Sequence, residues 1–158
     1  RLLSNFDSSD ISLRRISIKA LGAFGIRAIQ PLIEMFYLRK DRVIRTSCLK
    51  AFLQLAVYKD IGDFPDEVIT IVELALQTEQ PELILTAISL LKQLGKQGLP
   101  LLLRTSKDSN ILKAMASVTV LGESDDPLAE KCLRNLMEDP SIDELLLGSI
   151  KESLSHFC

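Results

Sequence analysis

The feature of this sequence that most constrains its fold is an internal repeat. Residues 10–21 and residues 41–52 share one pattern: an aspartate, an apolar residue, an arginine, a small residue, an apolar residue, a lysine and an alanine, in that order. Weaker copies follow, so that the five copies begin at Asp10, Asp41, Gln80, Asp108 and Asp139. A period of this size is typical of solenoid proteins, in which each repeat is one helical unit stacked on its neighbours.

Within each copy the apolar residues have the spacing of an α-helix with a wide buried face. Further helical segments are expected between the copies, where capping and turn residues precede apolar stretches: residues 28–38, 65–77, 98–105 and 127–138. Five glycines fall at the joints, where helices end and the chain turns: Gly22, Gly25, Gly95, Gly98 and Gly122. The sequence therefore predicts an all-α chain of about nine antiparallel helices, wound into a right-handed α-solenoid, or α-α superhelix.

Residues 21–33 resemble the joint of a HEAT repeat, an armadillo-like unit, and especially the short repeats of phycobilisome-lyase-like proteins. In such repeats an aspartate in the turn and an arginine at the start of the second helix form a polar ladder along the stack. The resemblance assigns this structural ladder to Asp10, Arg14, Asp41 and Arg45. It also implies that second helices line the concave surface, and these would begin near Ile11, Arg42, Pro81, Ser109 and Pro140.

The ladder weakens toward the C-terminus, because the arginine position is occupied by Ile84, Leu112 and Asp143 in the later copies. Less regular stacking is expected there. We expect one HEAT-repeat domain over residues 1–158, cut from a longer protein, since residues 1–6 match the end of a repeat. The expected repeats cover residues 1–23 (partial), 26–58, 63–95, 98–122 and 126–157.

Residues suited to catalysis or metal binding are sparse. His156 is the one histidine, and with Cys158 beside it the pair lacks the third group that a metal or nucleophile site needs. Cys48 and Cys132 fall at buried helical positions, where an inert thiol is expected. Acidic clusters at residues 125–126 and 139–144 coincide with expected helix starts, so helix capping accounts for them. We expect no catalytic residue, no cofactor and no metal.

Three cysteines without CxxC spacing argue against a disulfide framework and favour a reducing, cytoplasmic compartment. The apolar runs are far shorter than the roughly 20 residues that a membrane-spanning helix needs. No membrane association is therefore expected.

Charge is divided unevenly along the chain. Residues 1–59 carry eleven lysines and arginines against four acidic residues, whereas residues 60–158 carry eight against seventeen. Apart from the ladder arginines, the basic residues of the first part predict a solvent-facing, partner-binding basic patch of Arg15, Lys19, Arg39, Lys40, Arg42 and Lys50. Ile84 and Leu85 lie on a helix with little polar face, so they are either buried by neighbouring repeats or exposed as an apolar partner-binding patch.

Three functions follow from these features. The first is a non-enzymatic protein-interaction scaffold that uses a concave groove to bind a protein or peptide with an acidic segment, with self-association as a further use of the charge polarity. The second, implied by the resemblance, is an accessory subunit of a bilin lyase-type protein. The third is nucleic-acid binding, which the pI of about 5.5 and the lack of tryptophan make the weakest.

Overall fold

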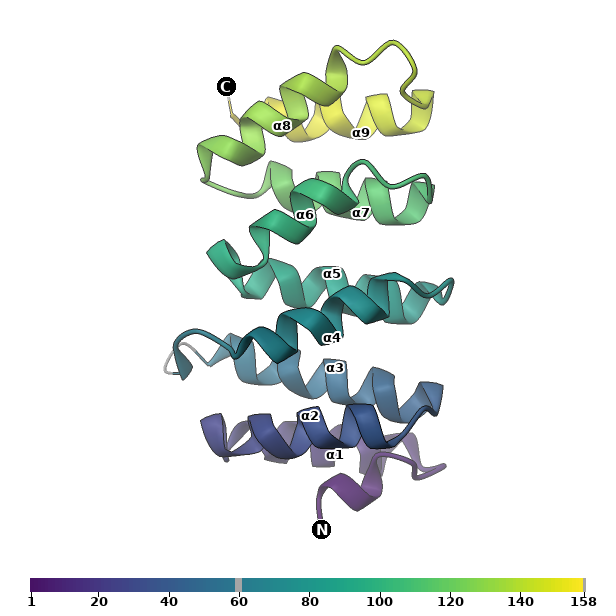
Figure 1. Ribbon diagram of the computed structural model, residues 1–158, viewed down its shortest axis with the longest axis vertical. Helices are drawn as coiled ribbons and strands as arrows, with labels where there is room; N and C mark the ends of the chain where they lie inside the picture. The colour runs from purple at the N-terminus through teal and green to yellow at the C-terminus, as the bar shows by residue number, and fades with distance from the viewer. Residues whose placement is uncertain (59–60, 158) are drawn as a thin grey trace. The chain divides into compact units, whose positions relative to one another are not determined.

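The computed structural model describes residues 1–58 and 61–157, and within these residues helices joined by turns and loops make up the fold, without a strand (Figure 1). Nine α-helices lie in this part of the chain: α1 (Ile11–Gly22), α2 (Ile29–Leu38), α3 (Arg42–Val57), α4 (Asp66–Leu76), α5 (Pro81–Gln93), α6 (Leu99–Thr105), α7 (Ile111–Gly122), α8 (Pro127–Met137) and α9 (Glu144–Ser155). Short 3-10 helices occupy η1 (Leu3–Asn5), η2 (Gly25–Ala28) and η4 (Gly95–Gln97). The predicted all-α class is thus confirmed. Cys158 lies outside the described residues.

The helices form two compact units, Arg1–Leu94 and Gly95–Cys158, which we call unit 1 and unit 2. In unit 1, α3 packs between α1 and α5, and α2 and α4 form a second layer over them (Figure 1). In unit 2, α7 packs on α9, and α6 and α8 cover this pair. Each unit therefore has the two-layer arrangement that antiparallel helix pairs produce.

The starts of the helices follow from their capping residues. Asp10 and Asp41 accept hydrogen bonds from two amides of the first turns of α1 and α3, so these helices begin at Ile11 and Arg42 as predicted. The predicted starts near Ser109 and Pro140 are early. Asn110 caps α7, and Asp143 caps α9, whereas Asp139 is engaged by Ser141 in the preceding turn.

The ladder predicted for Asp10 and Arg14 is not formed in the described part of the chain. The Asp10 carboxylate accepts from the amides of Ser12 and Leu13, at 2.8 and 3.2 Å. Arg14 instead donates to the carbonyl oxygen of Ser8, in the loop before α1. The carboxylate is already used as a helix cap, so the arginine binds the backbone of the entering loop.

The same arrangement recurs at Asp41 and Arg45 in the next repeat. Asp41 caps α3, and Arg45 donates from Nε to the carbonyl oxygen of Arg39 at 3.3 Å. The Arg45 guanidinium carbon also lies 4.8 Å from the centre of the Phe36 ring, a cation–π distance. The repeated arginine thus fastens each helix to the loop that leads into it.

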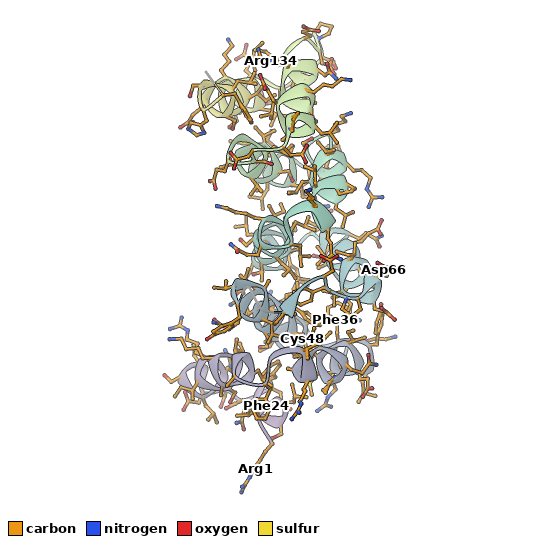
Figure 2. All side chains as sticks on the ribbon, turned by 90° about the vertical axis from the view of Figure 1, so that its left-hand side faces the viewer. Arg1, Phe24, Phe36, Cys48, Asp66 and Arg134 are labelled. Carbon is orange, nitrogen blue, oxygen red and sulfur yellow. The ribbon has the colours of Figure 1, made fainter. Side chains whose placement is uncertain are left out.

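The core of unit 1 lies between its two layers. Phe36 and Cys48 are inside it, whereas Phe24 lies at the surface (Figure 2). Phe52 is fully buried and meets Phe64 edge to face, with ring centres 6.5 Å apart. Burying a large apolar side chain stabilises a fold by about 1.5–3 kcal/mol, so these aromatic residues anchor the unit.

The core of unit 2 is built on aliphatic residues. Val118, Leu121, Leu133 and Ile150 are fully buried. Gly122, the last residue of α7, lies so close to α9 that a Cβ atom there would be 2.5 Å from the Cβ of Ser153. The glycine allows this close approach, and Ser153 donates to the carbonyl oxygen of Val118 at 3.2 Å across the same contact.

None of the helices in residues 1–58 and 61–157 is both long enough and apolar enough to cross a membrane.

Candidate functional site

Unit 1 has an open groove of about 430 Å³ between α1 and α3. It is lined by four residues of α1 and four of α3: Arg15, Ile16, Ile18, Lys19, Lys50, Leu53, Gln54 and Val57. We call it the α1–α3 groove. The α3 residues follow one another at i, i+3, i+4 and i+7, which is the spacing of a single helix stripe. From Lys50 to Val57 this stripe runs about 10 Å, since an α-helix rises about 1.5 Å per residue.

The floor of the α1–α3 groove is apolar. Ile16 is 64% exposed and Val57 is 55% exposed, although both are large hydrophobic residues. Leu53 is half-buried between them in the lining, and Ile18 is buried below. Exposed apolar side chains that line one depression mark a binding surface more strongly than scattered ones do.

The rim of the α1–α3 groove is cationic. Arg15 and Lys19 are exposed and lie four residues apart on α1, so they point from the same stripe. Lys50 is exposed on the opposite wall, on α3. Within the residues that the structure describes, Arg15 and Lys19 have no ion-pair partner. The groove can thus accept an apolar surface bearing negative charge.

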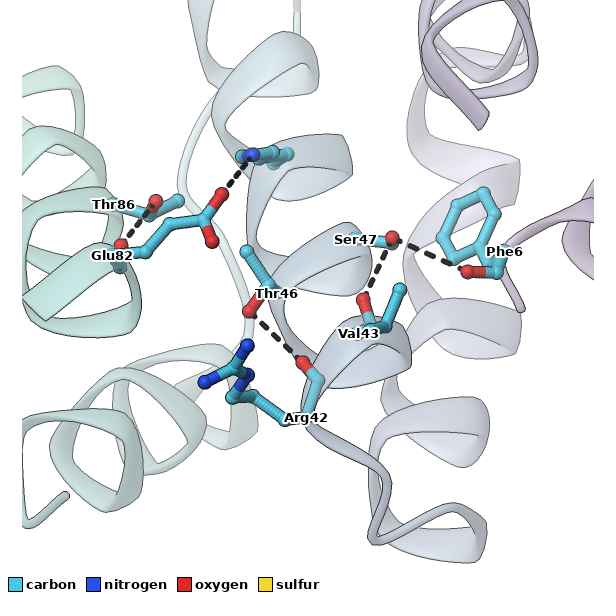
Figure 3. A network of polar contacts seen from close by, with 8 residues as sticks. Phe6, Arg42, Val43, Thr46, Ser47, Glu82 and Thr86 are labelled. Atoms are coloured by element: carbon cyan, nitrogen blue, oxygen red, sulfur yellow. Dashed lines mark hydrogen bonds and ion pairs between the residues drawn. The ribbon is translucent and has the colours of Figure 1, made fainter. Parts of the chain in front are cut away.

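Lys50 has a partner in the neighbouring helix. Its Nζ atom lies 2.6 Å from Oε1 of Glu82, the second residue of α5 (Figure 3). The hydrogen bond from Lys50, its charge, and the charges of Arg42 and Arg14 hold the pKa of Glu82 below its ordinary value, against a smaller opposing effect of burial. The carboxylate of Glu82 therefore stays ionised among cations.

The structure divides the predicted basic patch. All six residues are exposed, and Arg15, Lys19 and Lys50 meet at the α1–α3 groove. Arg39 instead approaches Asp7, with Nη2 3.5 Å from Oδ2. Lys40 follows Arg39 in the loop between α2 and α3, and Arg42 is the first residue of α3. The last three residues thus surround the start of α3 and do not line the groove.

The predicted apolar patch is reduced to one residue. Ile84 is fully buried in unit 1, so it cannot contact a partner there. Leu85, the next residue of α5, is 43% exposed. One residue along a helix turns the side chain by about 100°, which separates a core position from a surface position.

The contacts of Cys48, Cys132 and His156 are those of structural residues, and none of them requires a catalytic or metal-binding role. Burial raises the pKa of Cys48 to about 12, with the charge of Arg45 opposing this, so the thiol stays protonated. Cys132 is buried with its sulfur 3.6 Å from Oγ of Ser106. His156 Nδ1 lies 3.3 Å from the carbonyl oxygen of Gly122. Within the described residues no three His, Cys, Asp or Glu side chains gather as metal ligands would.

One aspartate of each acidic cluster in unit 2 caps a helix, whereas Asp139 lies in the turn before α9. Asp126 accepts from the amide of Leu128, and Asp143 accepts from the amide of Leu145. The side chain of Asp139 accepts from Ser141 twice, which keeps its pKa below the ordinary value.

Sequence reasoning missed Glu82 and the apolar floor of the α1–α3 groove. Glu82 stands in the first turn of its helix, where an acidic residue is expected for the helix dipole alone. Ile16 and Val57 carried a usable signal, because each is an apolar residue on the polar side of an otherwise amphipathic helix.

No family model matches this chain. Two curated proteins of cyanobacterial strains are similar to it along nearly its whole length. The "Bilin biosynthesis protein CpeZ" of Synechococcus sp. (strain WH8020) is 27% identical over 161 aligned residues, which cover 98% of this chain and 87% of that protein. The "Uncharacterized phycocyanin operon protein Z" of Pseudanabaena tenuis (strain PCC 7409) is 22% identical over 156 residues, covering 98% of this chain and 77% of that protein.

These relatives correct the first functional prediction. A non-enzymatic protein-interaction scaffold that uses a concave groove is wrong as the main function, because a bilin biosynthesis protein aligns with 98% of the chain. The bilin-related alternative, which the short repeats indicated, fits the relatives better.

Proposed function

We propose that this chain is an accessory subunit that works with a bilin lyase and contributes by binding rather than by catalysis. The observation that carries the proposal is the alignment of 98% of the chain with a bilin biosynthesis protein. The α1–α3 groove supports a binding role, because it combines an apolar floor with three cationic residues.

The proposed partner is a protein of the bilin attachment pathway, either the acceptor protein or the lyase, and it presents an acidic segment to unit 1. Charge complementarity supports this choice, since Arg15 and Lys19 are exposed beside apolar residues that are also exposed. Complementary charge accelerates encounter and fixes the orientation of the bound partner. The proposal places this work in the cytoplasm.

The architecture belonging to this proposal is the right-handed solenoid of HEAT-like repeats that the sequence predicts. The two-layer packing inside unit 1 and inside unit 2 supports it. Repeat stacks of this kind bind partners over an extended surface of adjacent second helices.

The proposal is tested by reconstituting bilin attachment. A phycobiliprotein subunit, its bilin lyase and bilin-producing enzymes are co-expressed with or without this chain, and covalent bilin is measured by zinc-enhanced fluorescence in denaturing gels. We expect the chain to raise the yield of bilin-carrying acceptor and to have no effect when the lyase is left out. Attachment without the lyase would show that the chain is itself an enzyme. An unchanged yield with all components present would refute the accessory function.

A further inference from the structure

We infer that the α1–α3 groove docks an amphipathic acidic helix of a partner protein, and that Glu82 occupies Lys50 in the free chain until a carboxylate of that helix replaces it. The inference rests on the proposed function for the identity of the pathway. It adds the form of the ligand and an internal competitor for the same site.

The shape of the groove favours a helix. Its walls are two helices of one layer, and the lining residues of α3 recur at i, i+3, i+4 and i+7. Side chains with this spacing form ridges along a helix, and the side chains of a third helix can pack into the grooves between such ridges. Bound helices of this type contribute apolar anchors at the same spacing, over about two turns. The roughly 10 Å stripe from Lys50 to Val57 matches that length.

A small-molecule ligand fits this groove less well. Such ligands are held in pockets that cover most of their surface. The α1–α3 groove is open along its length, and its floor residues Ile16 and Val57 remain more than half exposed. An elongated partner that brings its own backbone structure can cover these side chains without an enclosing wall.

The charges select an acidic helix. Arg15 and Lys19 stand on one wall and Lys50 on the other, with the apolar floor between them. Carboxylates that flank the apolar stripe of a docked helix would therefore meet a cation on each side. The described residues that line the groove include no carboxylate. The lining therefore presents no negative charge that would repel an acidic partner.

The ion pair between Glu82 and Lys50 is a contact of the kind that a partner carboxylate would make. Its carboxylate holds the Lys50 ammonium at 2.6 Å although it comes from the adjacent helix α5. Both side chains are well exposed, at 45% for Lys50 and 64% for Glu82. An exposed ion pair of this kind contributes little free energy, so an incoming carboxylate can exchange with Glu82 at low cost.

The experiment measures binding of two synthetic peptides by fluorescence anisotropy at low ionic strength. Both carry leucines at i, i+3, i+4 and i+7 in a helix-forming sequence; one has glutamates beside the leucine stripe and the other has glutamines. We expect the acidic peptide to bind the intact chain more tightly than the neutral one. We expect E82Q to tighten acidic-peptide binding by roughly two- to fivefold and to leave neutral-peptide binding unchanged.

Two variants separate exchange at Lys50 from a general charge effect. Glu152 lies exposed on α9, a helix that contributes no residue to the groove lining, so E152Q changes the net charge by the same amount and should not alter binding. In a K50Q background E82Q should bring no gain, because Glu82 then has no ammonium to occupy. Thermal unfolding monitored by circular dichroism confirms that each variant is folded.

Three results would overturn the inference: equal binding of the two peptides, a gain from E82Q that persists without Lys50, or a gain of the same size from E152Q. A linear tetrapyrrole that binds in place of the peptide, with the same dependence on Lys50, would identify the occupant as a small molecule instead. Dimerisation in analytical ultracentrifugation that K50Q abolishes would identify a second copy. Peptide binding without stimulation of bilin attachment would refute the proposed function alone, and stimulation without peptide binding would refute this inference alone.

Discussion

The pair α1 and α3 in unit 1 and the pair α7 and α9 in unit 2 each join equivalent helices of two consecutive sequence repeats, but the two pairs present different surfaces. In unit 1 the pair leaves an open groove with apolar floor and cationic rim. In unit 2 the pair closes tightly, with Gly122 against Ser153. Lys113 of α7 is buried, and its Nζ atom lies 4.0 Å from Oδ2 of Asp108. A side-chain cap stands at the start of each of these four helices. The comparison teaches that capping maintains the fold, whereas the spacing and surface of the paired helices are free to differ.

The largest effect is expected from adding a methyl group at the two equivalent helix ends. At Gly122 a Cβ would lie 2.9 Å from the backbone Cα of Ser153, so Gly122→Ala should lower the free energy of unfolding by about 1–3 kcal/mol. At Gly22 the nearest atom, at 2.7 Å, belongs to the Tyr58 ring, which can move away. There the better helix propensity of alanine, up to about 1 kcal/mol, offsets the cost, and Gly22→Ala should be nearly neutral. Urea denaturation measures the free energy of unfolding of both variants. An equal loss of stability in the two would contradict the difference in packing between the two helix ends.

Charge reversal comes next and tests whether the groove of unit 1 is the binding surface. The triple variant Arg15→Glu, Lys19→Glu and Lys50→Glu should weaken binding of the acidic peptide by more than about tenfold, which is about 1.4 kcal/mol. The matched control reverses three exposed lysines of unit 2, Lys107, Lys131 and Lys151. Similar losses in anisotropy titrations of both variants would show a net-charge effect and remove the distinction between the units.

Loss of a helix cap should lower the free energy of unfolding by a smaller amount. The cost should be larger for the helix whose cap binds more amides. Asp41 accepts from two amides of α3, at 2.8 and 3.2 Å, whereas Asp143 accepts from one amide of α9 at 2.8 Å. We expect Asp41→Ala to cost about 1–2 kcal/mol and Asp143→Ala about 0.5–1 kcal/mol. Chemical denaturation at pH 7 measures both, and the opposite ranking would show that the number of capped amides does not set the cost.

The smallest effect concerns the Lys50–Glu82 pair and its pH dependence. The pKa of Glu82 is lowered in the folded chain from its ordinary value of 4.5, so its stabilising contribution is present above pH 4.5 and is lost as the pH falls through the lowered pKa. E82Q should therefore be less stable than the parent by about 0.3 kcal/mol at pH 7, and the difference should shrink as the pH falls through the lowered pKa of Glu82. A difference that does not change with pH in chemical denaturation would contradict the ion-pair origin. E152Q serves as the control.

The fold was predictable where local signals act alone. Asp10, Asp41 and the proline at Pro81 determine the helix starts through hydrogen bonds and backbone geometry within a few residues, and those predictions are confirmed. The start of α9 was predicted early because Asp139 and Asp143 are both competent caps. Which of the two is used depends on the turn that Ser141 forms with Asp139, and sequence spacing alone does not reveal this.

The candidate site was predictable in part. Arg15, Lys19 and Lys50 could be identified because exposed basic residues recur on successive helices. Glu82 could not, since its contact with Lys50 joins residues 32 positions apart on different helices. Of the two possibilities that the sequence leaves open for Ile84, burial is the one observed. Its helix is apolar on nearly every side, so the packing of unit 1 rather than the pattern of the helix decides which of its residues are buried.

The most direct test of a binding role in bilin attachment is the yield of covalent bilin per acceptor protein in the reconstituted reaction, measured with the parent chain, the groove triple variant and the unit 2 control triple variant. We expect the parent and the control to raise the yield of covalent bilin equally. With the groove variant the yield should stay close to that measured without the chain. Full stimulation by the groove variant would contradict a role for the α1–α3 groove, and no stimulation by the parent would contradict the accessory function itself.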